Sequence, residues 1–75
     1  MKELLEIIAK SLVSKPESVS VNEIVDGDIV TLELSVAEED MGKVIGKQGK
    51  IAKAIRSVMK AAALKEEKKV NVDIL

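Results

Sequence analysis

Cysteine, histidine and aromatic residues are all absent from this chain of 75 residues, and proline occurs once. Without cysteine or histidine, the chain forms neither a disulfide nor a Cys/His zinc site that could stabilise a small core. It also lacks the side chains that most often serve enzymes as general base and as thiol nucleophile. These absences oppose an enzyme, and they predict a protein without cofactor or metal.

Long hydrophobic runs are missing as well. No apolar stretch approaches the ~20 residues that cross a bilayer, and acidic residues interrupt the apolar ones at the N-terminus, unlike a secretory signal. We therefore expect a cytoplasmic protein without membrane insertion, folded as one domain over residues 1–75. Since 47% of its residues are hydrophobic and it has no covalent staple, dimer formation would bury further apolar surface, and we expect a homodimer.

The charges are distributed unevenly, although the net charge is only −1. Residues 41–60 contain half of the 12 basic residues and none of the 13 acidic ones. A solvated helix face usually mixes both signs. One sign over such a stretch favours a surface for an anionic ligand. The basic residues of this stretch are Lys43, Lys47, Lys50, Lys53, Arg56 and Lys60.

Hydrophobic periodicity predicts the first half of the chain as a helix followed by a hairpin. Apolar residues at helical spacing favour a helix over residues 2–13, which Pro16 ends. β-branched residues over 18–25 and strict alternation over 30–36 predict two antiparallel strands, joined at Asp26-Gly27-Asp28. Glu38-Glu39-Asp40 then supplies negative charge to the first turn of a short helix ending near Ile45, which we favour over a cation site.

The second half of the chain predicts a longer helix and a last strand. A helix from Lys50 to about Leu64 should place basic residues on one face and bury the other, and alternation over 70–74 predicts a strand. The run Ala61-Ala62-Ala63 permits close approach of another helix, either inside the domain or across a dimer. The residues that we expect on the buried face of this helix are Ile51, Ile55, Val58 and Ala62.

Between the short and the long helix lies the loop Gly46-Lys47-Gln48-Gly49. Glycine has no β-carbon, so the backbone of such a loop can approach a bulky anion closely. The following helix directs its unpaired first-turn N–H groups and the positive end of its dipole to the same place. These features, with the lysines around them, predict a phosphate-binding loop.

The motif Val44-Ile45-Gly46-Lys47-Gln48-Gly49 resembles the signature of the KH (K-homology) RNA-binding domain. The wider run DMGKVIGKQGKIAKAIRSVMKAAA, residues 40–63, resembles more narrowly the small bacterial single-KH proteins of the KhpA type. The resemblance covers essentially the whole chain. It implies an α+β fold of type II KH order, α-β-β-α-α-β, in which three helices pack on one face of a three-stranded sheet.

The resemblance also implies a site. A groove between the two central helices and the second strand would hold about four nucleotides of single-stranded RNA, whose backbone the glycine loop clamps. The clamp would comprise Gly46, Lys47, Gln48 and Gly49. The hydrophobic flank would comprise Ile45 and Ile51, supported by Val44. Phosphate contacts would come from Lys43, Lys50, Lys53 and Arg56.

Two departures from the family pattern bear on binding. Ala52 stands where many KH domains carry a β-branched apolar residue, which predicts a shallower groove. Without aromatic rings, bases cannot stack on side chains, a contribution of ~1–3 kcal/mol per base. We expect weak binding with little sequence discrimination, so that avidity from a second domain matters.

Two other functions compete with an RNA-binding module. An enzyme is opposed by the missing nucleophiles and by the lack of the Gly-x-x-x-x-Gly-Lys-Ser/Thr spacing of nucleotide triphosphate sites. A protein-interaction subunit that has lost RNA binding is the alternative, although the glycines and lysines of the loop are retained. The resemblance implies a second KH protein of the Jag/KhpB type as partner, and a role in post-transcriptional control, as regulator or RNA chaperone, and in cell-envelope growth.

Overall fold

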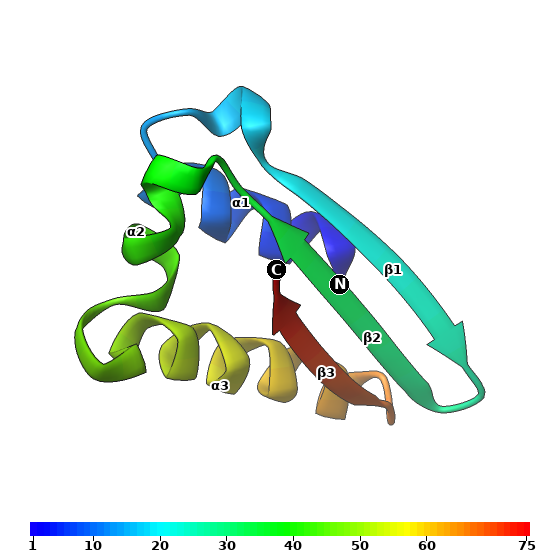
Figure 1. Cartoon of the computed structure of the whole chain (residues 1–75). Coiled ribbons are helices and arrows are strands. Elements are labelled where there is room, and N and C mark those ends of the chain that lie inside the picture. The colour runs from blue at the N-terminus through cyan, green and yellow to red at the C-terminus, as the bar shows by residue number, and fades with distance from the viewer.

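Three helices cover one face of a three-stranded sheet in the computed structural model, which describes all residues from Met1 to Leu75 (Figure 1). This α+β architecture and the order helix-strand-strand-helix-helix-strand confirm the predicted type II KH arrangement. No helix is both long and apolar enough to cross a membrane. The elements are α1 (Lys2–Leu12), β1 (Ser20–Asp26), β2 (Ile29–Ser35), α2 (Met41–Ile45), α3 (Lys50–Lys65) and β3 (Lys69–Ile74), with single 3-10 turns at Pro16–Ser18, Glu38–Asp40 and Lys47–Gly49.

The sheet is mixed, with strand order β1-β2-β3. β1 and β2 form the predicted antiparallel hairpin, in which Asp26 pairs with Ile29 and Gly27 takes a φ of +59° in the turn. β3 pairs parallel to β2, with Leu32 opposite Val72. A parallel partner requires a crossover connection, which here contains α2, the glycine loop and α3. The topology therefore fixes the loop between two packed helices.

The core lies between the sheet and the helices, and it is entirely aliphatic apart from one methionine. Alternate residues of β2 face it, as the period of two predicts, and α1 contributes Leu5 and Ala9. Residues that are buried in this core are Leu5, Ala9, Val21, Val30, Leu32, Leu34, Val44, Ile55, Met59 and Val72.

The buried face of α3 differs from the predicted one. Of the four residues expected inside, Ile55 is buried, but Val58 is 47% exposed and Ala62 is only half-buried. The structure instead buries Met59 together with Ala52 and Ala63. Apolar residues extend around more than half of this helix, so two stripes satisfy the periodicity. The stripe with small alanines lets the helix lie close to the sheet.

Asp40 is the one buried charged residue, and it joins the loop after α1 to the start of α2. Its Oδ1 accepts hydrogen bonds from the Ser14 hydroxyl (2.7 Å) and the Ser14 N–H (3.1 Å), and its Oδ2 accepts one from the Lys15 N–H (3.0 Å). The Ser14 hydroxyl bond is the largest cause that lowers the Asp40 pKa from 3.8 to about 2, against the opposing effect of burial. From the sequence, Asp40 was predicted only as part of the negative charge at the start of a short helix.

Candidate nucleic-acid interface

The glycine loop makes a sharp turn between α2 and α3. Gly46 has φ 75° and ψ 174°, and Gly49 has φ 76° and ψ 14°, so both lie where side chains are disfavoured. Gln48 between them takes the left-handed φ of 57°. The Gly46 N–H donates to the Gly42 carbonyl at 2.8 Å, and the Gly49 N–H donates to the Gly46 carbonyl at 3.2 Å. These bonds hold the loop in one shape.

The two residues between the glycines, Lys47 and Gln48, are exposed at the tip of the loop. No side chain caps the start of α3, so the positive end of its dipole is open to solvent beside the loop. α3 is 16 residues long, which makes this dipole substantial. The arrangement can receive an anion on backbone N–H groups and lysine side chains.

All six basic side chains of residues 41–60 are exposed. One of them forms an ion pair: Lys43 Nζ lies 3.3 Å from Oδ1 of the buried Asp40. The other five have no ion-pair partner in the structure. Lys43 is therefore held toward its own helix start, a restraint that the sequence did not reveal because Asp40 lies just before the acid-free stretch.

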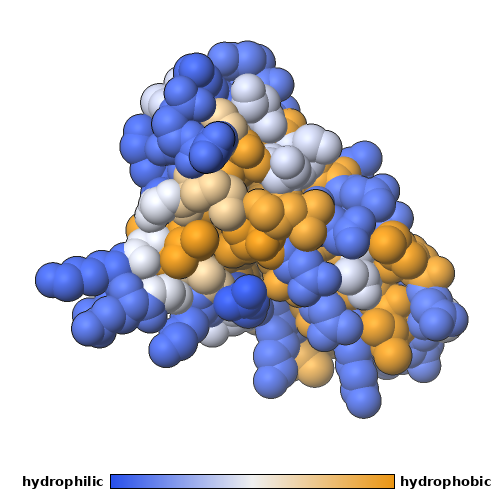
Figure 2. Space-filling view, viewed as in Figure 1, coloured by the Kyte–Doolittle hydropathy of each residue, from blue (hydrophilic) through white to orange (hydrophobic).

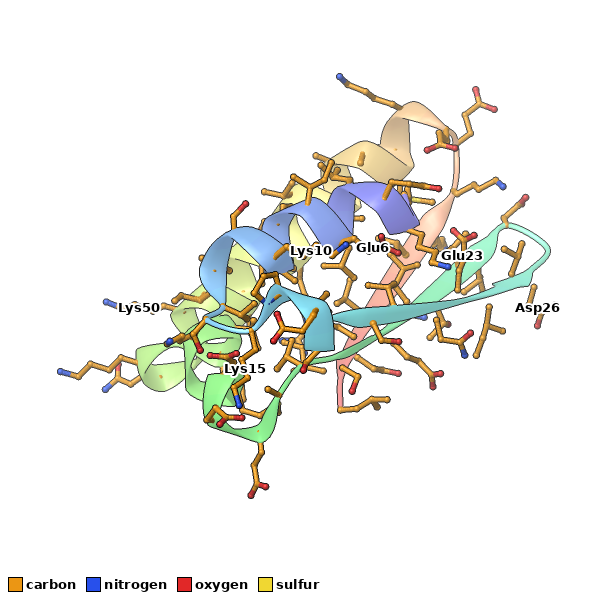
Figure 3. All side chains as sticks on the ribbon, turned by 90° about the horizontal axis from the view of Figure 1, so that it is seen from above. Glu6, Lys10, Lys15, Glu23, Asp26 and Lys50 are labelled. Carbon is orange, nitrogen blue, oxygen red and sulfur yellow. The ribbon has the colours of Figure 1, made fainter.

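One group of acidic residues lies on the hairpin, away from the glycine loop. The hairpin of β1 and β2 contains four carboxylates and no basic residue: Glu23, Asp26, Asp28 and Glu33. Seen from above, Lys50 at the start of α3 and Asp26 at the hairpin tip lie at opposite ends (Figure 3). The carboxylates at the tip of the hairpin are thus remote from the glycine loop (Figure 3), although Lys68 and Lys69 lie near the same tip, where the Lys69 N–H donates to the Asp28 carbonyl at 2.8 Å. An anionic ligand is directed to the loop.

The predicted hydrophobic flank divides into exposed and buried parts. Ile45 is 36% exposed and Ile51 is half-buried, whereas Val44 lies wholly inside the core. Val44 thus supports α2 from beneath and does not itself reach a ligand. Figure 2 shows apolar surface between α2 and the C-terminal end of β3, bordered by long hydrophilic side chains below. This surface is the aliphatic platform of the candidate site.

The strand that borders this surface is β3, the second strand of the core β2-α2-α3-β3 (Figure 2). β2 is hydrogen-bonded on both sides, so its backbone is unavailable, whereas the outer edge of β3 has no neighbouring strand. The Lys69 and Leu75 N–H groups bond to the β2 side. By the alternation of a parallel strand, the polar backbone groups of Val70, Val72 and Ile74 face the open edge.

One of these edge groups is already occupied. Arg56 Nε donates a hydrogen bond of 3.2 Å to the Val72 carbonyl. This bond fixes the guanidinium between α3 and β3. Beside it lies an open hollow of about 440 Å³, lined by Arg56 and Lys60 from α3 and by Asn71 and Asp73 from β3, among others. Lys60 was predicted only as part of the basic stretch, without a role in the groove, and Asn71 was not predicted, because only the fold brings β3 alongside α3.

A second hollow, on the other side of α3, is apolar. Its volume is about 340 Å³, and it lies between α1 and α3, lined mainly by Ile8, Leu12, Ile51, Ala54 and Val58. Only one polar residue, Lys50, borders it. The side of α3 that faces away from β3 is thus hydrophobic and accessible.

Comparison with known proteins shows the family of this chain. The model of the family described as "KhpA/KhpB, KH domain" matches residues 2–74. A Clostridium perfringens protein named RNA-binding protein KhpA is 69% identical, and its namesake from Clostridium acetobutylicum is 64% identical, each over the full length of both chains. The Chlamydia trachomatis protein of the same name is 43% identical and is covered over 96% of its length.

A solved structure shares the fold. In the crystal structure of an Aquifex aeolicus Era variant bound to GDP and AlF4⁻, 28% of the chain superposes on 97% of this one, with a TM-score of 0.65 and 26% identity. Relatives named as RNA-binding proteins also agree with the expectation that this is not an enzyme. On the family match and these identities, the chain belongs to the KhpA/KhpB family of KH-domain proteins.

Proposed function

We propose that this protein binds single-stranded RNA, with the glycine loop as a clamp on the sugar-phosphate backbone. The observation that carries the proposal is the loop itself: two positive-φ glycines present Lys47 and Gln48 at the uncapped, positive end of a long helix. The names of the relatives support RNA as the ligand. A KH clamp of this kind engages about four nucleotides.

The other site residues have distinct roles in this proposal. Lys50, Lys53 and Arg56 neutralise phosphates along α3, and Lys43 contributes less because Asp40 holds it. Ile45 and Ile51 form the exposed platform on which a base rests, while Val44 only supports it from the core. The open edge of β3 offers backbone groups to base edges. Because no ring stacks on the bases, affinity and sequence preference are low.

Reversing the charge of the loop tip tests the clamp. The variant Lys47→Asp/Gln48→Asp places two carboxylates where the phosphate binds, at exposed positions where substitutions rarely change stability by more than about 0.5 kcal/mol. We expect it to abolish RNA binding in a fluorescence titration and to melt as the wild type does. The control Lys2→Asp/Ser18→Asp changes the net charge equally at sites away from the loop. Unchanged affinity of the loop variant would refute the clamp.

A second role, protein interaction, is favoured by the apolar hollow between α1 and α3. We propose that this surface forms a homodimer or the contact with a second KH protein of the Jag/KhpB type. Leu12 and Val58 border it and are substantially exposed. Pairing of two such domains would raise the weak affinity of each for RNA by avidity. The two surfaces meet at the start of α3, because Lys50 and Ile51 of the proposed RNA site also border this hollow.

The cellular role in this proposal is post-transcriptional regulation or RNA chaperoning by one KH domain spanning residues 1–75. Such a role places the protein in the bacterial cytoplasm, where its RNA ligands are found. Crosslinking the protein to RNA in its own cells and sequencing the bound fragments tests this role. Recovery of defined transcripts supports it, and recovery equal to that of the Lys47→Asp/Gln48→Asp variant contradicts it.

A further inference from the structure

The C-terminal end of α3 carries a second basic surface, remote from the glycine loop. It surrounds an open hollow of about 430 Å³ lined by Lys60, Leu64, Lys68, Lys69, Val70 and Asn71. Three of these six residues are lysines and none is a carboxylate. We refer to these six residues as the distal surface. None of its lysines has an ion-pair partner in the structure.

The distal surface also combines charge with apolar area. Leu64 is 67% exposed, one of the most exposed large hydrophobic side chains of the chain. It lies in the same lining as the three lysines and Val70. An aliphatic side chain beside several ammonium groups suits a nucleotide, because the base can rest on the former while the phosphate pairs with the latter. Lysines alone would suit any anion.

Backbone hydrogen bonds fix the position of Lys68. The Lys68 N–H donates to the Ala63 carbonyl at 2.9 Å, and the Glu67 N–H donates to the Leu64 carbonyl at 3.1 Å. With Glu67 at a φ of +57°, these bonds form a Schellman motif that ends α3 and starts β3. They also satisfy two terminal carbonyls of the helix.

A continuous path joins the distal surface to the glycine loop. Its hollow shares Lys60, Val70 and Asn71 with the hollow beside Arg56. From there Arg56, Lys53 and Lys50 follow at spacings of three residues toward the loop, and Lys50 at the helix start also borders the apolar hollow between α1 and α3. At 1.5 Å per residue, Lys50 and Lys60 are about 15 Å apart along the helix. Asp73 is the only carboxylate in the lining of the two hollows.

We propose that the distal surface binds nucleotides of the same RNA strand that lie beyond the four held by the glycine loop. The inference rests on the proposed RNA-binding function and extends its site along the groove between α3 and β3. In Figure 1 these two elements lie close together at their connection and diverge toward the loop, so one strand can follow both. The protein then prefers RNA longer than the clamp requires.

Strands of two lengths test the proposal. Single-stranded RNAs of about four and about ten nucleotides are titrated against the wild type, against Lys60→Gln/Lys68→Gln/Lys69→Gln, and against a control with the same charge loss, Lys2→Gln/Lys10→Gln/Lys15→Gln. Loss of up to three phosphate contacts lowers the salt slope of the long strand by about 2, at ~0.7 per contact. We expect the distal variant to bind the long strand about tenfold less tightly at moderate salt, with the short strand and the control nearly unchanged.

The outcomes separate this inference from the clamp. Equal wild-type affinity for the two lengths, or a distal variant that binds the long strand as the wild type or control does, would overturn the distal surface. So would equal losses for both lengths. Failure of the clamp appears elsewhere, as short-strand binding that is insensitive to Lys47→Asp/Gln48→Asp. Thermal melting of each variant establishes that it is folded.

Discussion

Ile51 packs directly against Gly46 across the glycine loop. A β-carbon on Gly46 would lie 2.6 Å from Cγ1 of Ile51 and 2.9 Å from its backbone nitrogen, closer than such atoms approach. The backbone nitrogen belongs to the first turn of α3 and cannot move without moving the helix. Gly46 is thus required for the approach of the loop to α3, in addition to its positive φ.

Gly46→Ala should therefore deform the loop. We expect a loss of about 1–3 kcal/mol of unfolding free energy from strain and a marked loss of RNA affinity. The matched variant is Gly49→Ala, which also has a positive φ but whose β-carbon would meet nothing within 4 Å. Gly49→Ala should lower the free energy of unfolding by about 1–2 kcal/mol, because only the positive φ opposes the alanine. If denaturant unfolding shows Gly46→Ala to be the milder of the two, the packing account is wrong.

Asp40 should make stability depend on acid pH. Its folded pKa of about 2 lies below its ordinary value of 3.8, so the charged form is favoured by folding. The charged Asp40 contributes fully to the free energy of unfolding when the pH is above its ordinary pKa of 3.8. This contribution is lost as the pH falls from 3.8 toward the folded pKa of about 2. Asp40→Asn should melt at a lower temperature at neutral pH. The gap to the wild type should narrow between pH about 5 and about 2; a constant gap would contradict the assignment.

Replacing Glu67 by glycine should stabilise the protein. It occupies the left-handed position of the Schellman motif with φ +57°, where glycine is preferred. Glu67→Gly relieves this strain and should raise the unfolding free energy by about 0.5–1 kcal/mol, after the entropy cost of glycine. Glu66→Gly is the control: Glu66 has an ordinary φ of −99°, so this variant should have a lower free energy of unfolding than the wild type. Chemical denaturation measures both, and the reverse order would contradict this reading of the helix end.

A substitution at Val58 tests whether the protein forms a homodimer. It is exposed beside the apolar hollow between α1 and α3, so Val58→Asp costs the monomer little but places a charge in the proposed interface. We expect the wild type to sediment as a dimer at micromolar concentration, with a melting temperature that rises with concentration. Val58→Asp should sediment as a monomer. A wild type that stays monomeric up to hundreds of micromolar would contradict the homodimer.

The sequence predicted the elements well because their patterns are local. Alternation in β2, the turn at Gly27 and the glycine loop each follow from neighbouring residues. The buried stripe of α3 could not be chosen in the same way. Val58 and Met59 are both apolar and adjacent, so only the distance of the helix from the sheet, set by Ala52 and Ala63, decides which one faces inward.

The features of the candidate site that the sequence missed depend on contacts between distant segments. Asp40 bonds to Ser14, 26 residues away, and this contact also engages Lys43. Arg56 meets Val72 only because β3 returns beside α3. A pattern of charges along the chain identifies which residues are basic. It does not show which of them form an ion pair with a buried carboxylate or a hydrogen bond with a strand edge.

The clamp is tested most directly by comparing single-stranded RNA with its duplex over a range of salt concentrations. A groove for about four nucleotides excludes a duplex, which presents a continuous A-form surface. With roughly 2–4 phosphates neutralised, the logarithm of the affinity for the short single strand should fall by ~1.4–2.8 per tenfold rise in salt. The account predicts this slope and weak competition by the duplex. Equal affinity for both forms, or no dependence on salt, would contradict it.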